Sequence, residues 1–288
     1  MISKELETLV RDELAQPVDR RVLAMAAAVA ARHGDASRAV LFYGSCLREK
    51  QLDGLMLDFY LIVSDYRAAY KKPWMARANA LIPPNVFPFQ HDGLAAKYAV
   101  LSEADFHRLS GPETRNVSVW ARFAQPSRLV WAADEAARAT AIAAVARAAP
   151  TLLGAAGRIA EEAPLDWWRR AFALTYSAEL RAERKGRSGS VVDADAERYE
   201  RFSAPAAAAI EPNAASGGWG RRRIEGKLLS VARLAKASAT YAGGADYIVW
   251  KINRHAGTAF ELKPWQRRHP LLGAISLLPR LLKSGAIR

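Results

Sequence analysis

The sequence predicts an α+β protein in which a mixed sheet with helices is followed by a mostly helical region and a basic, amphipathic helical tail. Apolar residues first recur at helical spacing, and short runs rich in β-branched and aromatic residues follow up to about residue 110. Alanine-rich segments with helical periodicity come after residue 131. With 288 residues and 51% hydrophobic content, the chain can bury a sizeable core.

The first expected domain covers residues 1–131. Apolar residues on recurring faces predict two helices within residues 5–33. The runs "RAVLFYG", "LMLDFYLIVSDY" and "LAAKYAVLSEADF" are separated by polar or Pro-rich stretches and predict three strands of one sheet.

The rest of the chain divides into three expected parts. Residues 132–202 are dominated by alanine and by apolar residues at helical intervals, which predicts a helical domain. Residues 203–220 combine Pro, Gly, Ser and Ala without apolar periodicity and are expected to be a flexible linker. Residues 221–288 are basic and helical in pattern, with breaks at glycine and proline.

Cysteine and histidine usage excludes several classes of site. Cys46 is the single cysteine, so an internal disulfide and a cysteine zinc site are excluded and a reducing compartment fits. The five histidines have no metal-ligand spacing. The N-terminus mixes acids with bases and lacks the apolar core of a secretory signal, so we expect no cleaved leader. The Ala- and Arg-rich composition favours a bacterial cytoplasm.

The basic charge is concentrated near the C-terminus. Residues 213–288 hold 14 Lys or Arg against three acids, so this segment carries +11 of the formal net charge of +13. The last part also has an apolar helical face beside basic residues, which predicts peripheral attachment to an anionic membrane. The expected membrane-binding residues are Trp265, Leu271, Ile275, Leu278, Arg280, Leu282 and Lys283. An oligomerisation helix, and hence a homo-oligomer, is the competing interpretation of this face.

A Gly-Ser pair and a later aspartate carry the strongest chemical signal. Gly44 and Ser45 follow an apolar strand, where a glycine permits a tight turn and the next backbone N–H groups can cradle a phosphate. Asp58 lies among apolar residues of the next strand, where a carboxylate is costly unless it is paired or binds a cation. This arrangement resembles the nucleotidyltransferase fold, in which Gly-Ser precedes an acid that holds magnesium.

The second acid of that pattern is missing from its usual position. Tyr60 stands two residues after Asp58 and cannot be an anionic ligand at neutral pH. Asp65 would lie far along the strand, on its other face. Asp53 in the loop and Glu179 in the helical region are the remaining candidates.

Several segments in order resemble one family, the mitochondrial-type phosphatidate cytidylyltransferases, also called CDP-diacylglycerol synthases. "YGSCLR", "MLDFYLIVSDY", "AKYAVLS", "WARFAQP" and "TYSAELRAERKGR" are similar to motifs of that family, and the resemblance extends from about residue 41 to 257. Cys46, Met75 and Gln125 depart from the family pattern. The resemblance implies a nucleotidyltransferase-like first domain and a winged-helix-like second one.

The resemblance also implies an activity: transfer of CMP from CTP to phosphatidic acid, which gives CDP-diacylglycerol and pyrophosphate for phospholipid synthesis. It implies Mg²⁺ as cofactor, held by Asp58 and Glu179. Lys97 would be catalytic, and Gly44, Ser45, Arg122 and Arg181 would bind the nucleotide.

The expected location is the cytoplasm, attached peripherally to the inner face of the cell membrane. Two other functions stay open. One is a catalytically silent, membrane-associated nucleotide-binding protein, and the other is a nucleotidyltransferase with a different acceptor. Nucleic acid is not expected as a partner, because phosphate-backbone binding does not require an apolar stripe beside the basic residues.

Overall fold

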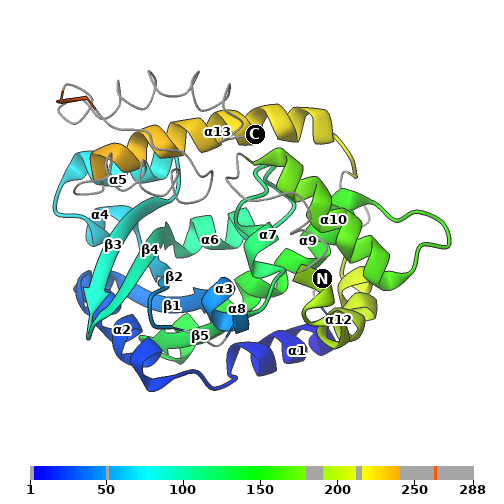
Figure 1. The fold of residues 1–288 in the computed structure, drawn as a ribbon, viewed down its shortest axis with the longest axis horizontal. Helices are drawn as coiled ribbons and strands as arrows, with labels where there is room; N and C mark the ends of the chain where they lie inside the picture. Colours follow the sequence, from blue (N-terminus) through cyan, green and yellow to red (C-terminus); the bar gives the residue numbers. More distant parts are fainter. Residues whose placement is uncertain (1–2, 50–51, 180–190, 212–215, 241–262, 265–288) are drawn as a thin grey trace.

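The protein is α+β, with a five-stranded mixed sheet followed by a mostly helical region (Figure 1). The computed structural model describes residues 3–49, 52–179, 191–211, 216–240 and 263–264. The strand order in the sheet is β3-β4-β2-β1-β5. The strands are β1 Ser37–Tyr43, β2 Met56–Val63, β3 Asn85–His91, β4 Leu94–Ser102 and β5 Ser127–Ala132.

The pairing of the central strands brings polar residues together at one end of the sheet. Strand β2 pairs with β1 in antiparallel fashion and with β4 in parallel. Asp58 on β2 therefore lies between Tyr43 on β1 and Lys97 on β4 in the register of the sheet. Because the side chains of a strand alternate between the two faces, directly opposed residues share a face.

Helices cover both faces of the sheet. Helices α2, α4 and α5 contribute to one apolar cluster, which includes Met25, Phe42 and Phe59. The other cluster is larger and joins the opposite face to the helical region, through residues such as Leu41 and Trp120. The helices of the first part are α1 Lys4–Leu14, α2 Arg20–Ala31, α3 Ser45–Glu49, α4 Tyr66–Ala69, α5 Pro73–Leu81, α6 Glu103–Ser110 and α7 Trp120–Phe123, with a 3₁₀ turn at Gly34–Ala36.

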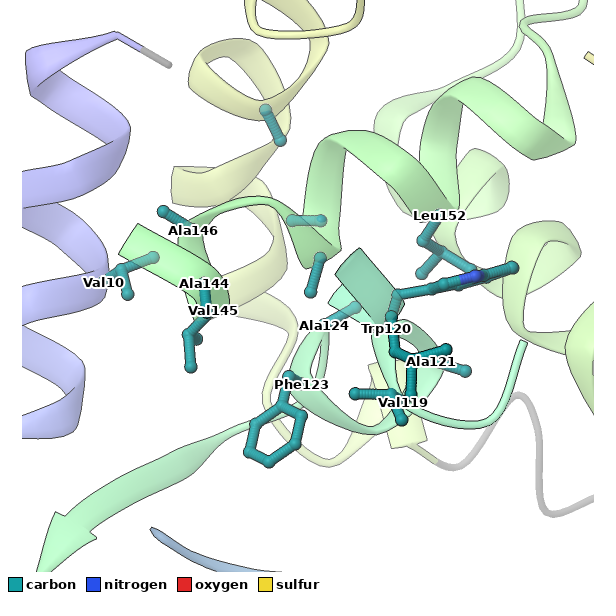
Figure 2. Packing of buried hydrophobic residues seen from close by; sticks show 14 of the residues in the cluster. Val10, Val119, Trp120, Ala121, Phe123, Ala124, Ala144, Val145, Ala146 and Leu152 are labelled. Carbon is teal, nitrogen blue, oxygen red and sulfur yellow. The ribbon is translucent and has the colours of Figure 1, made fainter. Parts of the chain in front are cut away.

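The helical region packs directly against the sheet and α1. Figure 2 shows Val10 of α1 beside Val145, and Trp120 of α7 beside Leu152. The helices here are α8 Glu135–Ala146, α9 Ala148–Ala156, α10 Pro164–Ala178, α12 Ala196–Ala208 and α13 Trp219–Thr240. The segment Glu135–Ala156 is long and apolar enough to cross a membrane by length and composition. However, 78% of the 18-residue apolar stretch within it is buried inside the protein. We therefore assign this segment to the core.

Much of the expected secondary structure is confirmed. The two N-terminal helices, the three strands β1, β2 and β4, and the helices of the alanine-rich middle region all form. Two strands were not predicted, and both lie at the edges of the sheet. Strand β3 contains Pro88, which a central strand would exclude but an edge strand accepts.

The expected flexible linker at 203–220 is only partly correct. Helix α12 continues to Ala208, because Phe202, Ser203 and Ala206 are buried against the core and hold the alanine-rich run in place. At the other end of the segment, Trp219 begins α13 and its indole Nε1 donates to the carbonyl of Ala155. Tertiary packing therefore overrides a composition typical of linkers.

Helix α13 joins the helical region to the sheet. It runs along the top of the view in Figure 1 and contacts both α10 and β3. Gly226 allows the closest approach, since a Cβ atom built there would lie 2.1 Å from the carbonyl oxygen of Ala178. The tail 221–288 was expected to be a membrane-binding segment, but its first helix is packed onto the fold, and Arg222 is buried there.

A buried ion pair ties α12 to α1. Arg198 donates to the Glu13 carboxylate through two nitrogens and to the carbonyl of Ala124. Removal of one partner would leave the other charge buried without compensation, so we expect Arg198→Met to lower the free energy of unfolding by about 3–5 kcal/mol. Urea unfolding measures this effect.

Arg169→Met is the matched control for this prediction. Arg169 forms exposed ion pairs with Asp166 and Asp193, and such pairs contribute at most about 1 kcal/mol. Equal losses in the two variants would contradict a structural role for the Glu13–Arg198 pair.

Candidate functional site

The candidate site lies where β1 ends and where β2 and β4 begin. Tyr43 is the last residue of β1 and pairs with Asp58, which in turn pairs with Lys97. The Asp58 and Lys97 side chains form an ion pair, with 2.5 Å between Oδ1 and Nζ. They retain 18% and 27% exposure, so the pair is accessible from solvent.

A glycine is required at position 44 by the backbone conformation there and by the close contact with Asp58. Its φ angle is +95°, a conformation that residues with a Cβ rarely adopt. A Cβ atom at this position would also lie 2.9 Å from Oδ2 of Asp58. The backbone therefore passes directly against the carboxylate, and Ser45 follows as the first residue of α3.

We expect Gly44→Ala to move the Asp58 carboxylate and to strain the turn. The strain should cost about 1–2 kcal/mol of unfolding free energy, and any activity that depends on Asp58 should fall with it. Gly54→Ala is a control, since Gly54 also has a positive φ of +75° but no atom of the described residues lies within 4 Å of its Cβ position. Equal activity losses in the two variants would contradict a special role for the Gly44–Asp58 contact.

The other aspartates have different partners. Asp65 caps α4 by accepting hydrogen bonds from the backbone N–H groups of Arg67 and Ala68. Asp53 forms an exposed ion pair with Arg21, at 2.9 Å. Arg21 belongs to α2, which packs on the opposite face of the sheet from Tyr60. Asp53 is therefore paired with a helix on the face of the sheet opposite to Tyr60.

Arg122 connects Glu179 to the sheet. Glu179 is buried at the C-terminal end of α10, and its Oε1 lies 3.7 Å from Nη1 of Arg122 on α7. Burial alone would lower the pKa of Arg122, but the Tyr60 phenol, the Glu179 carboxylate and the nearby Tyr43 and Asp58 together raise it. Both candidate metal acids therefore act electrostatically on one guanidinium group.

A cavity of about 160 Å³ opens beside these residues. Sheet residues form its floor, and the remaining polar side chains come from α7, from α13 and from Ser118 just before α7. It is lined by Tyr43, Phe59, Tyr60, Pro84, Val86, Lys97, Ala99, Ser118, Arg122, Arg233, Lys236 and Ala237. Burial and the Asp58 carboxylate raise the pKa of Tyr43, so its phenol stays neutral at physiological pH.

Sequence reasoning missed Ser118, Arg233 and Lys236. The two basic residues were assigned to the membrane-binding tail, whereas α13 turns them toward the cavity. The sequence contains one indication that the two residues act together, because "ARLAKA" sets Arg233 and Lys236 three residues apart among alanine and leucine. Residues at that spacing share a helix face. The packing of that face against β3 cannot be seen in local sequence.

Helix α13 is fixed to the loop before β3 by these same side chains. Arg233 donates to the carbonyl of Pro83 at 2.8 Å and to the Ser118 hydroxyl at 2.9 Å. Lys236 donates to the carbonyls of Ile82 and Pro84. Burial, and then the positive charge of Arg233, lowers the pKa of Lys236 to about 7.

This lowered pKa predicts a pH-dependent contribution to stability. An unfolded lysine has a pKa of about 10.4, so the unfolded chain binds more protons than the folded protein between about pH 7 and 10. The free energy of unfolding of the wild type should therefore rise over that range relative to Lys236→Met. The other titratable or charged groups that line the cavity are Tyr43, Tyr60, Lys97, Arg122 and Arg233.

Urea unfolding of both proteins at several pH values measures this difference. Lys227→Met, at an exposed position of the same helix, should behave like the wild type. A difference between the wild type and Lys236→Met that is constant from pH 6 to 10 would contradict the lowered pKa.

The acidic side chains of the site suit a magnesium ion only when that ion is bound to a nucleotide. Within the described residues, no group of three or more His, Cys, Asp or Glu side chains is placed to hold a metal ion. Asp58 and Glu179 are both paired with cations. The residues therefore fit an ion that arrives with a nucleotide, whose phosphates supply further oxygen ligands, and do not fit a resident ion held by protein alone.

In comparisons with known proteins, no family model and no curated protein matches this chain.

The structure brings together Gly44, Asp58, Lys97, Arg122 and Glu179, with Ser45 at the start of α3 beside them. Arg181 lies outside the described residues, as do all the expected membrane-binding residues: Trp265, Leu271, Ile275, Leu278, Arg280, Leu282 and Lys283.

Proposed function

We propose that this protein is a magnesium-dependent nucleotidyltransferase that transfers CMP from CTP to phosphatidic acid. The observation that carries the proposal is the juxtaposition of Gly44, Asp58 and Lys97 at one end of the sheet, beside a cavity with cationic walls. A cavity with this charge favours a ligand rich in phosphate. The order of the sequence motifs, including "YGSCLR" and "MLDFYLIV", supports the phosphatidate cytidylyltransferase type.

The reaction needs positioning and charge neutralisation more than proton transfer. An oxygen of the lipid phosphate attacks the α-phosphorus of CTP and forms a new P–O bond. The bond between the α-phosphorus and the bridging oxygen to the β-phosphate breaks, and pyrophosphate leaves with those electrons. The attacking oxygen is already ionised at neutral pH, so no general base is required. The described residues that line the cavity agree with this, since they include basic residues and tyrosines and none of them is a histidine.

Each side chain of the site has a role in this proposal. Lys97 and Arg122 offset negative charge on the transferred phosphorus and on the leaving group. Arg122 can clasp a phosphate with two parallel hydrogen bonds, whereas Lys97 acts as a point charge. Asp58 and Glu179 would hold the magnesium ion of the nucleotide. When bound, this ion supplies Lewis-acid neutralisation of the triphosphate.

Membrane attachment is proposed on sequence grounds. The apolar and basic pattern near the C-terminus would hold the enzyme on an anionic bilayer, where its lipid substrate is found. Removal of residues 262–288 should abolish flotation with liposomes that contain phosphatidic acid. Unchanged flotation of the truncated protein would refute this role.

A second candidate function is a catalytically silent nucleotide-binding protein. The pairing of Asp58 with Lys97 and of Glu179 with Arg122 favours it, because each carboxylate already has a cationic partner. In this case Mg·CTP would bind without turnover.

The experiment that separates the two functions is a transfer assay with purified full-length protein. CTP labelled in the cytidine is incubated with phosphatidic acid liposomes, with Mg²⁺ or with EDTA. The proposed enzyme gives lipid-soluble label only with Mg²⁺. Absence of label together with measurable CTP binding would favour the silent protein.

A further inference from the structure

We propose that Ser118, Arg122, Arg233 and Lys236 form a phosphomonoester subsite beneath α13, in which Arg122 is shared with the nucleotide end of the site at Gly44 and Asp58. In the reaction proposed above, on which this assignment rests, this subsite would hold the phosphate of the acceptor lipid. Its ligand class is a terminal phosphate dianion on an organic group.

Ser118 brings two guanidinium groups together. Its buried hydroxyl accepts a hydrogen bond from Nη1 of Arg233, and its carbonyl accepts one from Nη1 of Arg122. The two arginines come from different elements, α13 and α7, and both line the same cavity. Two guanidinium groups held in fixed orientation are suited to the tetrahedral oxygens of a phosphate.

The charges of Arg122 and Arg233 are balanced differently. Arg122 has Glu179 at 3.7 Å, whereas the hydrogen bonds of Arg233 go to neutral oxygens of Pro83 and Ser118. Burial and the neighbouring Arg122 lower the pKa of Arg233, although Tyr60 and Glu179 oppose this effect. A cation held among other cations in a partly buried cavity favours a bound anion, because the anion restores neutrality.

The remaining wall explains why the ligand should carry an organic group. Pro84, Val86 and Ala237 line the cavity beside the basic residues. An anion site with apolar walls on one side suits an ester better than free phosphate, whose whole surface prefers water. A lipid headgroup satisfies both requirements, since its phosphate meets the arginines and its glycerol carbons meet the apolar wall.

Direct binding tests this subsite without nucleotide. Full-length protein is titrated calorimetrically with dihexanoyl phosphatidate as a monomer in solution, and separately with inorganic phosphate. We expect Arg233→Gln to weaken phosphatidate binding at least about tenfold, the loss of one charge-assisted pair of hydrogen bonds. Lys227→Gln removes the same charge from an exposed position of α13 and should leave the affinity unchanged.

Two further variants cover a failure of Arg233→Gln to fold, which thermal unfolding would reveal. Ser118→Ala removes only the hydroxyl that orients Arg233, and Arg233→Lys keeps the charge without the planar fork. Both should weaken binding by about three- to tenfold. Equal affinities in the wild type and in all folded variants at positions 118 and 233 would overturn the subsite.

The two ligands identify the source of the phosphate. Tighter binding of phosphatidate, with dependence on Arg233, supports a site for a lipid headgroup. Equal binding of inorganic phosphate, with the same dependence, supports the anion site but assigns it to free phosphate.

The binding assay also separates this inference from the proposed function. If no transfer activity exists but binding depends on Arg233, the subsite stands and the proposed reaction falls. If transfer occurs and Arg233→Gln raises the KM for CTP while the KM for phosphatidate is unchanged, the reaction stands and the acceptor subsite is refuted.

Discussion

Asp58→Asn is expected to reduce CMP transfer by at least about 10²–10³-fold, the range observed when one preorganised electrostatic group is removed from an active site. Asparagine keeps the size of the side chain but removes its charge, so it can neither balance Lys97 nor bind a nucleotide-borne magnesium ion as an anion. The side chain is not fully buried, and the fold should be retained. The measurement is kcat with saturating CTP and phosphatidate, beside the thermal unfolding midpoint of both proteins.

Asp53→Asn is the matched control for this variant. This variant makes the same aspartate-to-asparagine change five residues earlier in the chain, at an exposed position where Asp53 pairs with Arg21. Its activity should stay within about twofold of the wild type, since exposed ion pairs contribute little. Equal loss in both variants would remove Asp58 from its special position and reopen Asp53 as the metal acid.

Gly226→Val is expected to force α13 away from α10. The Cβ position of Gly226 lies 2.1 Å from the Ala178 carbonyl, so any larger residue requires the backbones of α13 and α10 to separate. We expect a loss of unfolding free energy of about 1–3 kcal/mol or more, as for overpacked cores. Displacement of α13 would also carry Arg233 and Lys236 away from the cavity, so ligand affinity should fall with stability.

Gly220→Val provides the control on the same helix. Among the described residues, no atom lies within 4 Å of a Cβ atom at Gly220, so this substitution meets no close contact there. Its unfolding free energy should change by less than about 0.5 kcal/mol. If urea unfolding gave the same result for Gly220→Val and Gly226→Val, the close packing of α13 on α10 would be contradicted.

The parts of the fold that local sequence predicts are those whose pattern is set by burial. Strand β2 has an almost continuous apolar run because it is central, and helix α9 is apolar on all sides because it is enclosed by other elements. Strand β3 lies at the sheet edge and is only half buried, so its pattern was weak. The end of helix α12, residues 203–208, was assigned to a linker because its stability comes from contacts distant in sequence, such as that between Ser203 and Trp168.

The part of the candidate site that is brought together by strand pairing was predictable from the sequence. Asp58 and Lys97 lie on strands that pair directly, and an acid or a base among apolar residues marks each of these two strands. Gly44 directly follows β1, the other neighbour of the Asp58 strand. The position of Arg233 at the cavity depends on how α13 packs against β3. The periodicity of the helix itself does not indicate this packing. Its assignment to the tail was a consequence of treating the basic segment as one surface.

Labelled CTP shows which phosphorus of the triphosphate is transferred to the lipid. Phosphatidic acid liposomes and Mg²⁺ are incubated with CTP labelled at the α-phosphorus or at the γ-phosphorus, with wild-type protein and with Asp58→Asn. We predict α label in the lipid, γ label in pyrophosphate, and neither product with Asp58→Asn. Lipid-bound γ label, or α label in the lipid that is as abundant with Asp58→Asn as with the wild type, would contradict the assignment.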